Sequence, residues 1–425
     1  MAASGTAASA AAPADRSYAR GARILSVGIA STGLFTFAYF SVASHVLDDD
    51  AYGRISLLWA VLFVVLSVIY RPVEQLLSRT IADRRARGIE GHPLRGPALL
   101  QATFALVFLV AALALRGPIT DGLFDGEDAL FWIMVAAAMA YAVSYFARGY
   151  LAGHQWFGLY GGLVLFESVS RFCFPVAVAV GIATGETAVA LGIVAAPLAS
   201  LLVVPWALRR HTAASAAAAG APAERSGMRQ DAGFAMSVAG IQLAEQTLLN
   251  AAVLLVSSSV TSGVIFSALL IARAPLQLFQ AIQTSLLPHL AGLEATEGRE
   301  AFHRAIRQTI LAIAAFAGAV AVGLLLIGPW VMDLVFGTDE SYGRVGLAVL
   351  AVGMGLHLTA GTLNQAALAR GRAAQSAAAW AIAAVAFVIW MLLPVVDDQL
   401  VRTEAGYAGA AALLCALLYA LYRRN

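Results

Sequence analysis

Long apolar stretches recur along the whole chain, separated by short segments that carry most of the charged residues. Each stretch holds about 20 residues, the length that an α-helix needs to cross a hydrocarbon core about 30 Å thick. The pattern predicts an all-α, multi-pass membrane protein. We expect twelve spanning helices near residues 24–45, 53–78, 96–115, 129–148, 157–182, 187–208, 232–256, 262–290, 305–328, 345–369, 373–393 and 405–422.

One polar segment divides these helices into two groups of six. Residues 209–230 are rich in alanine, glycine and serine, which is typical of a flexible linker. Residues 1–23 have a similar composition and lack the basic residue ahead of an apolar core that marks a signal peptide, so a disordered cytosolic tail is expected there. The predicted organisation is this tail, a six-helix lobe over 24–208, the linker, and a second six-helix lobe over 231–425.

The arginines indicate how the chain is oriented in the membrane. All 27 positive residues are arginine, and 20 of them fall in loops and ends that lie on one side if the N-terminus is cytosolic. The loops on the other side hold four, and three more lie within predicted helices. Cytosolic loops of membrane proteins are enriched in arginine and lysine, so the bias predicts that both termini are cytosolic.

Composition and motifs argue against an enzyme. The chain is 60% hydrophobic and 12% charged, and its mean hydropathy is +0.79, whereas about 25% of a soluble domain is charged. The absence of lysine excludes a Walker A phosphate loop and a lysine Schiff base. The outer loops are short and acidic, and no HExxH, GxSxG or dinucleotide motif occurs. We expect no catalytic residue, cofactor, metal site or nucleic-acid partner.

The two halves show a weak internal similarity. Residues 71–75 (RPVEQ) and 273–277 (RAPLQ) share an arginine and a glutamine, each pair 202 residues apart. Residues 147–149 and 369–371 are both Ala-Arg-Gly, at the ends of the fourth and tenth predicted helices. Matches in the same ordinal helices predict two parallel repeats related by an axis along the membrane normal.

A family resemblance follows from these features. Residues 48–58, DDDAYGRISLL, resemble the acidic-x-Tyr-Gly-x-x-x-Leu-Leu turn of bacterial polysaccharide flippases. The Arg-Gly helix ends and the twelve-helix, two-lobe plan also resemble these members of the multidrug/oligosaccharidyl-lipid/polysaccharide exporter (MOP) superfamily, over about residues 24–422.

The resemblance implies a fold and a function. It implies a V-shaped pair of six-helix lobes around a central cavity, in the bacterial cytoplasmic membrane. The implied activity is alternating-access transport of undecaprenyl-diphosphate-linked oligosaccharide from the inner to the outer leaflet. The implied partners are that lipid-linked glycan, membrane lipids and polysaccharide assembly proteins.

Ionisable residues within the predicted helices are candidates for function, because a central charge costs about 2.5–3.5 kcal/mol on insertion scales. Glu167 precedes Arg171 by four residues, the favourable order for a helical ion pair, and a structural pair is predicted. Arg71, Glu74 and Gln75 share one face of the second helix and are substrate-binding candidates. The alternative for Arg71 is an arginine that snorkels to the cytosolic interface.

Two further helices carry polar residues. Gln242, Glu245 and Asn250 share a face of the seventh helix, where they either line the cavity or form hydrogen bonds between packed helices. Glu245 and His357 are candidates for carrying a coupling proton. The alternative for His357 is a buried, hydrogen-bonded structural histidine.

The eighth helix carries a polar stripe made of Arg273, Gln277, Gln280 and Thr284, spaced to lie on one face. A guanidinium binds a diphosphate through two parallel hydrogen bonds, and amides suit sugar hydroxyls. We therefore predict that this stripe contacts a charged, sugar-bearing headgroup. If Arg273 instead neutralises Glu245, it has a structural role.

Three other functions compete with this hypothesis. A cation-coupled multidrug exporter of the same fold is expected to carry an acidic residue in the first helix, and residues 24–45 hold none. A peptidoglycan-precursor flippase of the superfamily has fourteen spans, two more than predicted here. A non-transporting scaffold has no need of a lone arginine in the eighth helix.

Overall fold

In the computed structural model, residues 13–86, 94–201, 228–256, 258–274, 299–337 and 342–423 are described, and every regular element among them is a helix. The first group is α1 (Pro13–Val46), α2 (Asp49–Val65), the π-helical turn η1 (Leu66–Tyr70), α3 (Arg71–Ala86), α4 (Arg95–Ala114), α5 (Arg116–Leu123), α6 (Asp128–Gly153), α7 (Phe157–Ala179) and α8 (Gly185–Leu201). The second is α11 (Met228–Leu255), helix Ser259–Ala274, α13 (Arg299–Phe336), α14 (Arg344–Ala369), α15 (Ala373–Leu392) and α16 (Gln399–Arg423).

The prediction of an all-α, multi-pass membrane protein is confirmed. Eight of the described helices are long and apolar enough to cross a membrane, and two shorter apolar helices cover Gly185–Leu201 and Ser259–Ala274. Every one of the twelve predicted segments contains a described helix. The second predicted segment is a single rod built from α2, η1 and α3.

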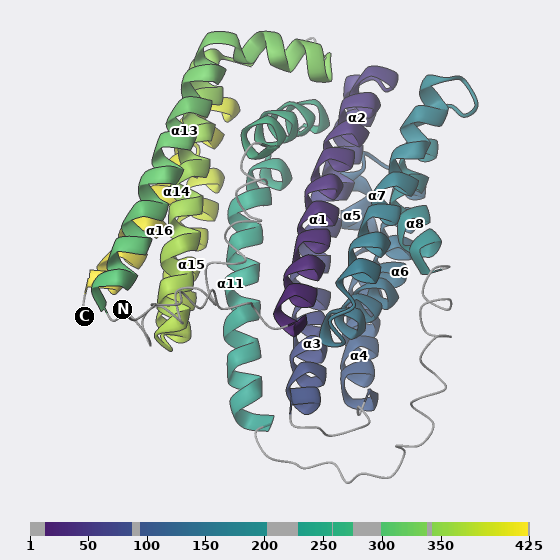
Figure 1. Ribbon diagram of the computed structural model, residues 1–425. Helices are drawn as coiled ribbons and strands as arrows, with labels where there is room; N and C mark the ends of the chain where they lie inside the picture. The colour runs from purple at the N-terminus through teal and green to yellow at the C-terminus, as the bar shows by residue number, and fades with distance from the viewer. Residues whose placement is uncertain are drawn as a thin grey trace, which may run out of the picture.

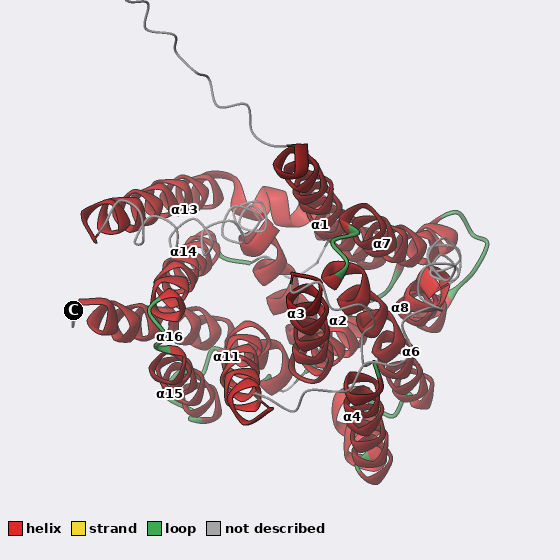
Figure 2. Ribbon diagram, turned by 60° about the horizontal axis from the view of Figure 1, so that its bottom comes forward, coloured by secondary structure: helices red, strands yellow, loops and turns green. Residues whose placement is uncertain are grey.

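The helices form two lobes. In the first, α7 packs against α1 and α8, and α6 packs against α3, α4 and α8. In the second, α14 packs against α13 and α16, and α15 packs against α11 and α16. Figures 1 and 2 show α1–α8 on one side of the molecule and α13–α16 on the other, with α11 between them and beside α2.

The ends of the predicted linker and tail differ from expectation. Helix α1 begins at Pro13, so the second half of the predicted tail is helical rather than disordered. This segment contains several alanines and arginines, which are good helix formers. Residues 202–227, which hold most of the predicted linker, lie outside the described residues. Helix α1 begins and α16 ends at the same end of the molecule (Figure 1), in keeping with an even number of crossings.

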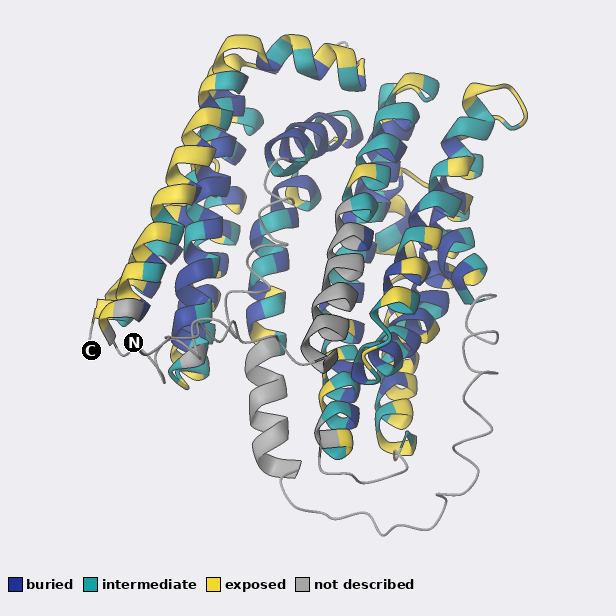
Figure 3. Ribbon diagram, viewed as in Figure 1, coloured by how far each residue is buried: buried dark blue, intermediate teal, exposed yellow. Residues whose placement is uncertain are grey.

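The outer faces of the helices are apolar and exposed, as lipid-facing surfaces are. Val322, Leu326 and Trp330 of α13 are 57%, 66% and 61% exposed. Figure 3 shows exposed residues along the outer side of α13 and buried ones on the side that faces α14. The outer face of α13 thus presents apolar side chains to the bilayer, where no water is available to solvate polar groups.

The lobes touch closely at one end of the molecule, the end predicted to face outside. The Ser41 hydroxyl donates to the carbonyl oxygen of Val335 (2.6 Å), and the Ser259 hydroxyl donates to Asp50 Oδ1 (2.9 Å). The last turns of α13, the helix that contains Pro329, cross toward α1 (Figure 1), and this crossing allows the contact between Ser41 and Val335. These contacts join the two lobes at this end.

Gly53 permits a close approach of the two lobes at this end. A Cβ atom on Gly53 would lie 2.0 Å from the carbonyl oxygen of Ser259, well inside contact distance. We expect Gly53→Ala to disfavour the closed arrangement and to shift molecules toward a state in which this end is open. Gly318→Ala is the control, because a Cβ there meets nothing within 4 Å.

The shift is measured by pulsed electron resonance between spin labels at Asp121 and Leu334, both exposed near this end, in a chain without Cys173 and Cys415. A longer distance in Gly53→Ala is the predicted outcome. Identical distance distributions in wild type and Gly53→Ala would show that this contact does not hold the end closed.

Candidate functional site

A cavity of about 280 Å³ lies between the two lobes. The first lobe contributes residues of α1, α2, η1, α6 and α7, and the second contributes residues of α11, helix Ser259–Ala274 and α14. Its polar and ionisable lining residues are Thr32, Thr36, Tyr141, Tyr145, Arg148, Glu167, Ser168, Arg171, Asn250, Arg273 and His357. Its volume is near the lower end of the usual range for small-molecule sites, about 300–1,000 Å³.

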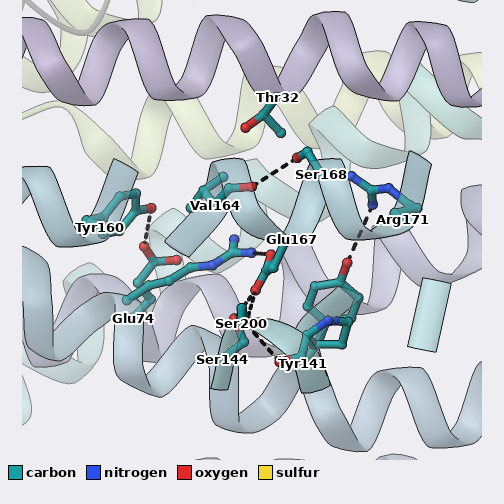
Figure 4. A network of polar contacts seen from close by, with 12 residues as sticks. Thr32, Glu74, Tyr141, Ser144, Tyr160, Val164, Glu167, Ser168, Arg171 and Ser200 are labelled. Atoms are coloured by element: carbon teal, nitrogen blue, oxygen red, sulfur yellow. Dashed lines mark hydrogen bonds and ion pairs between the residues drawn. The ribbon is translucent and has the colours of Figure 1, made fainter. Parts of the chain in front are cut away.

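Glu167 has a different partner from the one predicted. Its carboxylate forms an ion pair with Arg148 of α6 and accepts hydrogen bonds from the hydroxyls of Ser144 and Ser200 (Figure 4). Glu167 is buried, and its oxygens are satisfied by these three side chains from two neighbouring helices. The predicted structural pair of Glu167 with Arg171 is therefore wrong. Spacing along one helix shows which residues share a face, but it does not show which residue of a neighbouring helix lies opposite. Here the cation that pairs with Glu167 is Arg148 of α6.

Arg171 is consequently left without a carboxylate. Its guanidinium donates to Tyr141 Oη (3.5 Å) and Thr36 Oγ1 (3.3 Å) and lies 4.4 Å from the centre of the Trp59 ring. None of the described carboxylates lies within ion-pair distance of it, and its Nε is buried without a hydrogen-bond partner. Arg171 lines the cavity as a desolvated cation held by neutral groups.

Arg273 faces the same cavity from the second lobe. It lies one residue from the end of the described helix Ser259–Ala274, lines the cavity, and donates to the carbonyl oxygen of Leu249. Its Nε is buried without a partner, and no described carboxylate is within ion-pair distance. The alternative that Arg273 neutralises Glu245 disagrees with this geometry, because the ionisable partner of Glu245 is His357.

Glu245 belongs to a polar chain beside the cavity. Glu245 Oε1 lies 3.8 Å from His357 Nε2, and Glu245 Oε2 accepts a hydrogen bond from Gln242 Nε2 (3.2 Å). Gln242 Oε1 in turn accepts from Arg71 of the first lobe (3.4 Å). His357 lines the cavity, and its Nδ1 is buried without a partner. The chain runs from the exposed Arg71 to the cavity wall and links the lobes.

The remaining predicted residues are dispersed. Glu74 accepts a hydrogen bond from Tyr160 (2.7 Å) and does not line the cavity, and Gln75 is exposed. Asn250 lines the cavity and donates to Gln246 Oε1 (3.0 Å). The other three members of the predicted stripe lie outside the described residues: Gln277, Gln280 and Thr284.

The structure adds residues that the sequence pattern did not single out. Thr36 and Trp59 hold the Arg171 guanidinium, and Ser200 binds Glu167. A threonine, a tryptophan and a serine are common in membrane helices, so no spacing signal distinguishes them. In the described part of the chain, no group of three or more His, Cys, Asp and Glu side chains is placed to hold a metal ion.

The fold is that of known membrane transporters. The inward-facing conformation of a multidrug resistance MATE family transporter of the MOP superfamily gives a TM-score of 0.69 at 13% identity, covering 94% of this chain and 97% of that chain. An outward-facing conformation with the same description gives 0.64 at 14% identity, over 97% and 96%. A MATE transporter of Vibrio cholerae in the bent form gives 0.62 at 15% identity, over 96% and 98%.

Comparison of sequences adds no closer relative, since no family model and no curated protein matches the chain. The shared fold agrees with the two-lobe, twelve-helix architecture expected from the sequence, and these neighbours are transporters rather than enzymes. The fold of this chain is thus that of MOP superfamily transporters.

Proposed function

We propose that the protein is a secondary transporter that carries an anionic amphiphile by alternating access, and that its substrate is an oligosaccharide linked through a diphosphate to a polyprenyl lipid. The observation that carries this proposal is the pair of cavity arginines. Arg171 and Arg273 face one cavity from opposite lobes, and neither has a carboxylate partner among the described residues.

A diphosphate suits such a site. Each guanidinium offers two parallel N–H donors, and hydrogen bonds between ionised partners are about twice as strong as neutral ones. An anion placed between the lobes satisfies buried donors from both, including the orphaned Nε atoms of Arg171 and Arg273. Substrate binding therefore favours one arrangement of the lobes over another, as alternating access requires.

A cation-coupled multidrug exporter is the second candidate. The multidrug transporters among the structural neighbours favour it, and Glu167 places a carboxylate in the cavity although the first predicted helix has none. Against it, Arg148 already neutralises Glu167, and a cationic drug would meet two uncompensated guanidinium groups. Like charges in a desolvated site cost several kcal/mol.

Reconstitution into vesicles distinguishes the two candidates. We expect the protein to transfer a fluorescent polyprenyl-diphosphate oligosaccharide between leaflets, and to show no efflux of a cationic dye driven by a proton or sodium gradient. Vesicles containing Arg171→Ala protein serve as the matched control. Gradient-driven dye efflux without lipid transfer would favour the multidrug exporter and contradict the proposal.

The polar chain that contains Glu245 is the candidate coupling site. If Glu245 carries a proton, Glu245→Gln abolishes the dependence of transport on the pH gradient, because glutamine keeps the hydrogen bonds but does not titrate. Transport is measured with and without an imposed gradient. Glu186→Gln is the control, since Glu186 pairs with Arg54 away from the cavity. Gradient-dependent transport that persists in Glu245→Gln would leave Glu245 a structural residue.

A further inference from the structure

We propose that the end of the second lobe where α13 begins and α16 finishes binds the headgroup of an anionic phospholipid. Five arginines with described side chains form this basic corner: Arg304 and Arg307 of α13, Arg370 and Arg372 around the α14–α15 turn, and Arg423 of α16. None of them lines the cavity between the lobes.

Contacts between side chains bring these three segments together. The His303 ring is hydrogen bonded to the Tyr422 hydroxyl, which joins α13 to α16. The Arg370 guanidinium lies 4.4 Å from the centre of the Phe302 ring and 5.7 Å from that of Tyr422. Arg372 donates to the carbonyl oxygen of Leu421 (3.0 Å). The arginines are thus neighbours in space although they come from distant parts of the sequence.

The corner carries an excess of positive charge. Among the described residues of 299–311, 366–376 and 415–423, which form this corner, Glu300 is the single acidic residue, against the five arginines. Arg304, Arg307 and Arg423 are exposed, so their donors are available to a ligand. Basic pockets between helix ends at the cytosolic side of membrane proteins bind anionic headgroups.

A lipid-facing apolar surface continues from the corner along α13. Leu311, one turn beyond Arg307, is 57% exposed, and Phe316, Val322 and Leu326 are exposed farther along the helix. A phospholipid has the same arrangement, with its phosphate at the interface and its acyl chains running toward the bilayer centre. Tyr419 and Tyr422 at the end of α16 have the amphipathic side chains that gather at this interface.

The internal repeat shows that this corner differs from its counterpart. Arg148, the repeat equivalent of Arg370, pairs with Glu167 at the cavity, whereas Arg370 stacks on aromatic rings outside it. The arginines that favour cytosolic orientation occur on both lobes, including Arg84 and Arg85 of α3. The orientation of the chain in the membrane explains why both lobes carry positive charge at this end. It does not explain why the second lobe also has aromatic rings and an exposed apolar surface beside its arginines.

The test measures binding of a short-chain phosphatidylglycerol to the purified full chain in a neutral detergent, scored by the rise in unfolding temperature. Wild-type protein is expected to be stabilised by phosphatidylglycerol but not by phosphatidylcholine of the same chain length or by inorganic phosphate. The variant Arg304→Gln/Arg307→Gln/Arg423→Gln is expected to bind about a hundredfold more weakly, roughly fivefold per arginine. Arg307→Gln alone is expected to bind about fivefold more weakly.

The control variant Arg79→Gln/Arg84→Gln/Arg85→Gln removes the same charge from the first lobe and is expected to bind like wild type. Equal affinity of the second-lobe variant and wild type would overturn the proposal. An equal loss in both triple variants would do so as well, since it would indicate general attraction by net charge. Stabilisation by inorganic phosphate at the same concentration would identify a free-anion site instead.

Discussion

Arg273→Ala is expected to reduce transport by about 30-fold or more while the protein still inserts and folds. Truncating one partner of a buried, charge-assisted contact costs about 2–5 kcal/mol of binding free energy. Folding tolerates the change, because removal of an intramembrane cation relieves an insertion cost of about 2.5–3.5 kcal/mol, and Glu245 keeps its contacts with His357 and Gln242. Leaflet transfer and unfolding temperature are measured on the same purified protein.

Two comparisons sharpen this experiment. Arg273→Lys is expected to be impaired less than alanine, because an ammonium keeps the charge but loses the planar two-donor fork. Arg344→Ala, which removes an exposed arginine outside the cavity, is expected to transport like wild type. Full activity in a well-folded Arg273→Ala protein would remove Arg273 from the binding site. Lost stability that Glu245→Ala restores would instead show that Arg273 neutralises Glu245.

Arg148→Met is expected to destabilise the protein by about 3–5 kcal/mol, the largest effect on stability that the structure predicts. The substitution leaves the buried Glu167 carboxylate without its cation, and an uncompensated buried charge is costly. The free energy of unfolding is measured by denaturant titration in detergent. The double variant Arg148→Met/Glu167→Leu is expected to recover most of the loss, because apolar replacement of a whole buried pair is often neutral.

The exposed pair of Arg116 and Asp128 provides the matched control. Their side chains are 46% and 61% exposed, and Arg116→Met is expected to cost less than about 1 kcal/mol. A loss at Arg148 no larger than that at Arg116 would show that Glu167 is protonated or hydrated rather than held as a buried carboxylate.

The helices were predictable from the sequence because each is a long apolar segment bounded by charged or glycine-rich residues. The interaction partners of individual side chains were less predictable. Glu167 and Arg171 have ideal spacing along α7, yet Glu167 binds Arg148 and Arg171 binds Thr36 and Tyr141. Spacing along one helix describes a face, whereas partners are decided by which helix packs against that face.

The cavity shows the same limit. The sequence singled out Arg273, Asn250 and His357, which line the cavity. It also singled out substrate-binding candidates that do not line it: Arg71, Glu74, Gln75 and Gln242. Trp59 of the first lobe also lines the cavity. Tryptophan is common in membrane helices, so there was no reason in the sequence to select this residue. Cavity lining depends on how the two lobes are placed, and this placement leaves no periodic signal in either lobe.

The central claim is that arginines from both lobes hold one anionic group, and equilibrium binding of a short polyprenyl diphosphate tests it most directly. Binding to purified wild type, Arg171→Ala, Arg273→Ala and the double variant is compared with binding of the corresponding uncharged alcohol. We predict that the diphosphate binds more tightly than the alcohol, that each single variant loses about 30-fold or more, and that the alcohol binds all four proteins alike. Equal binding of diphosphate and alcohol to wild type, or undiminished diphosphate binding by the double variant, would contradict this account.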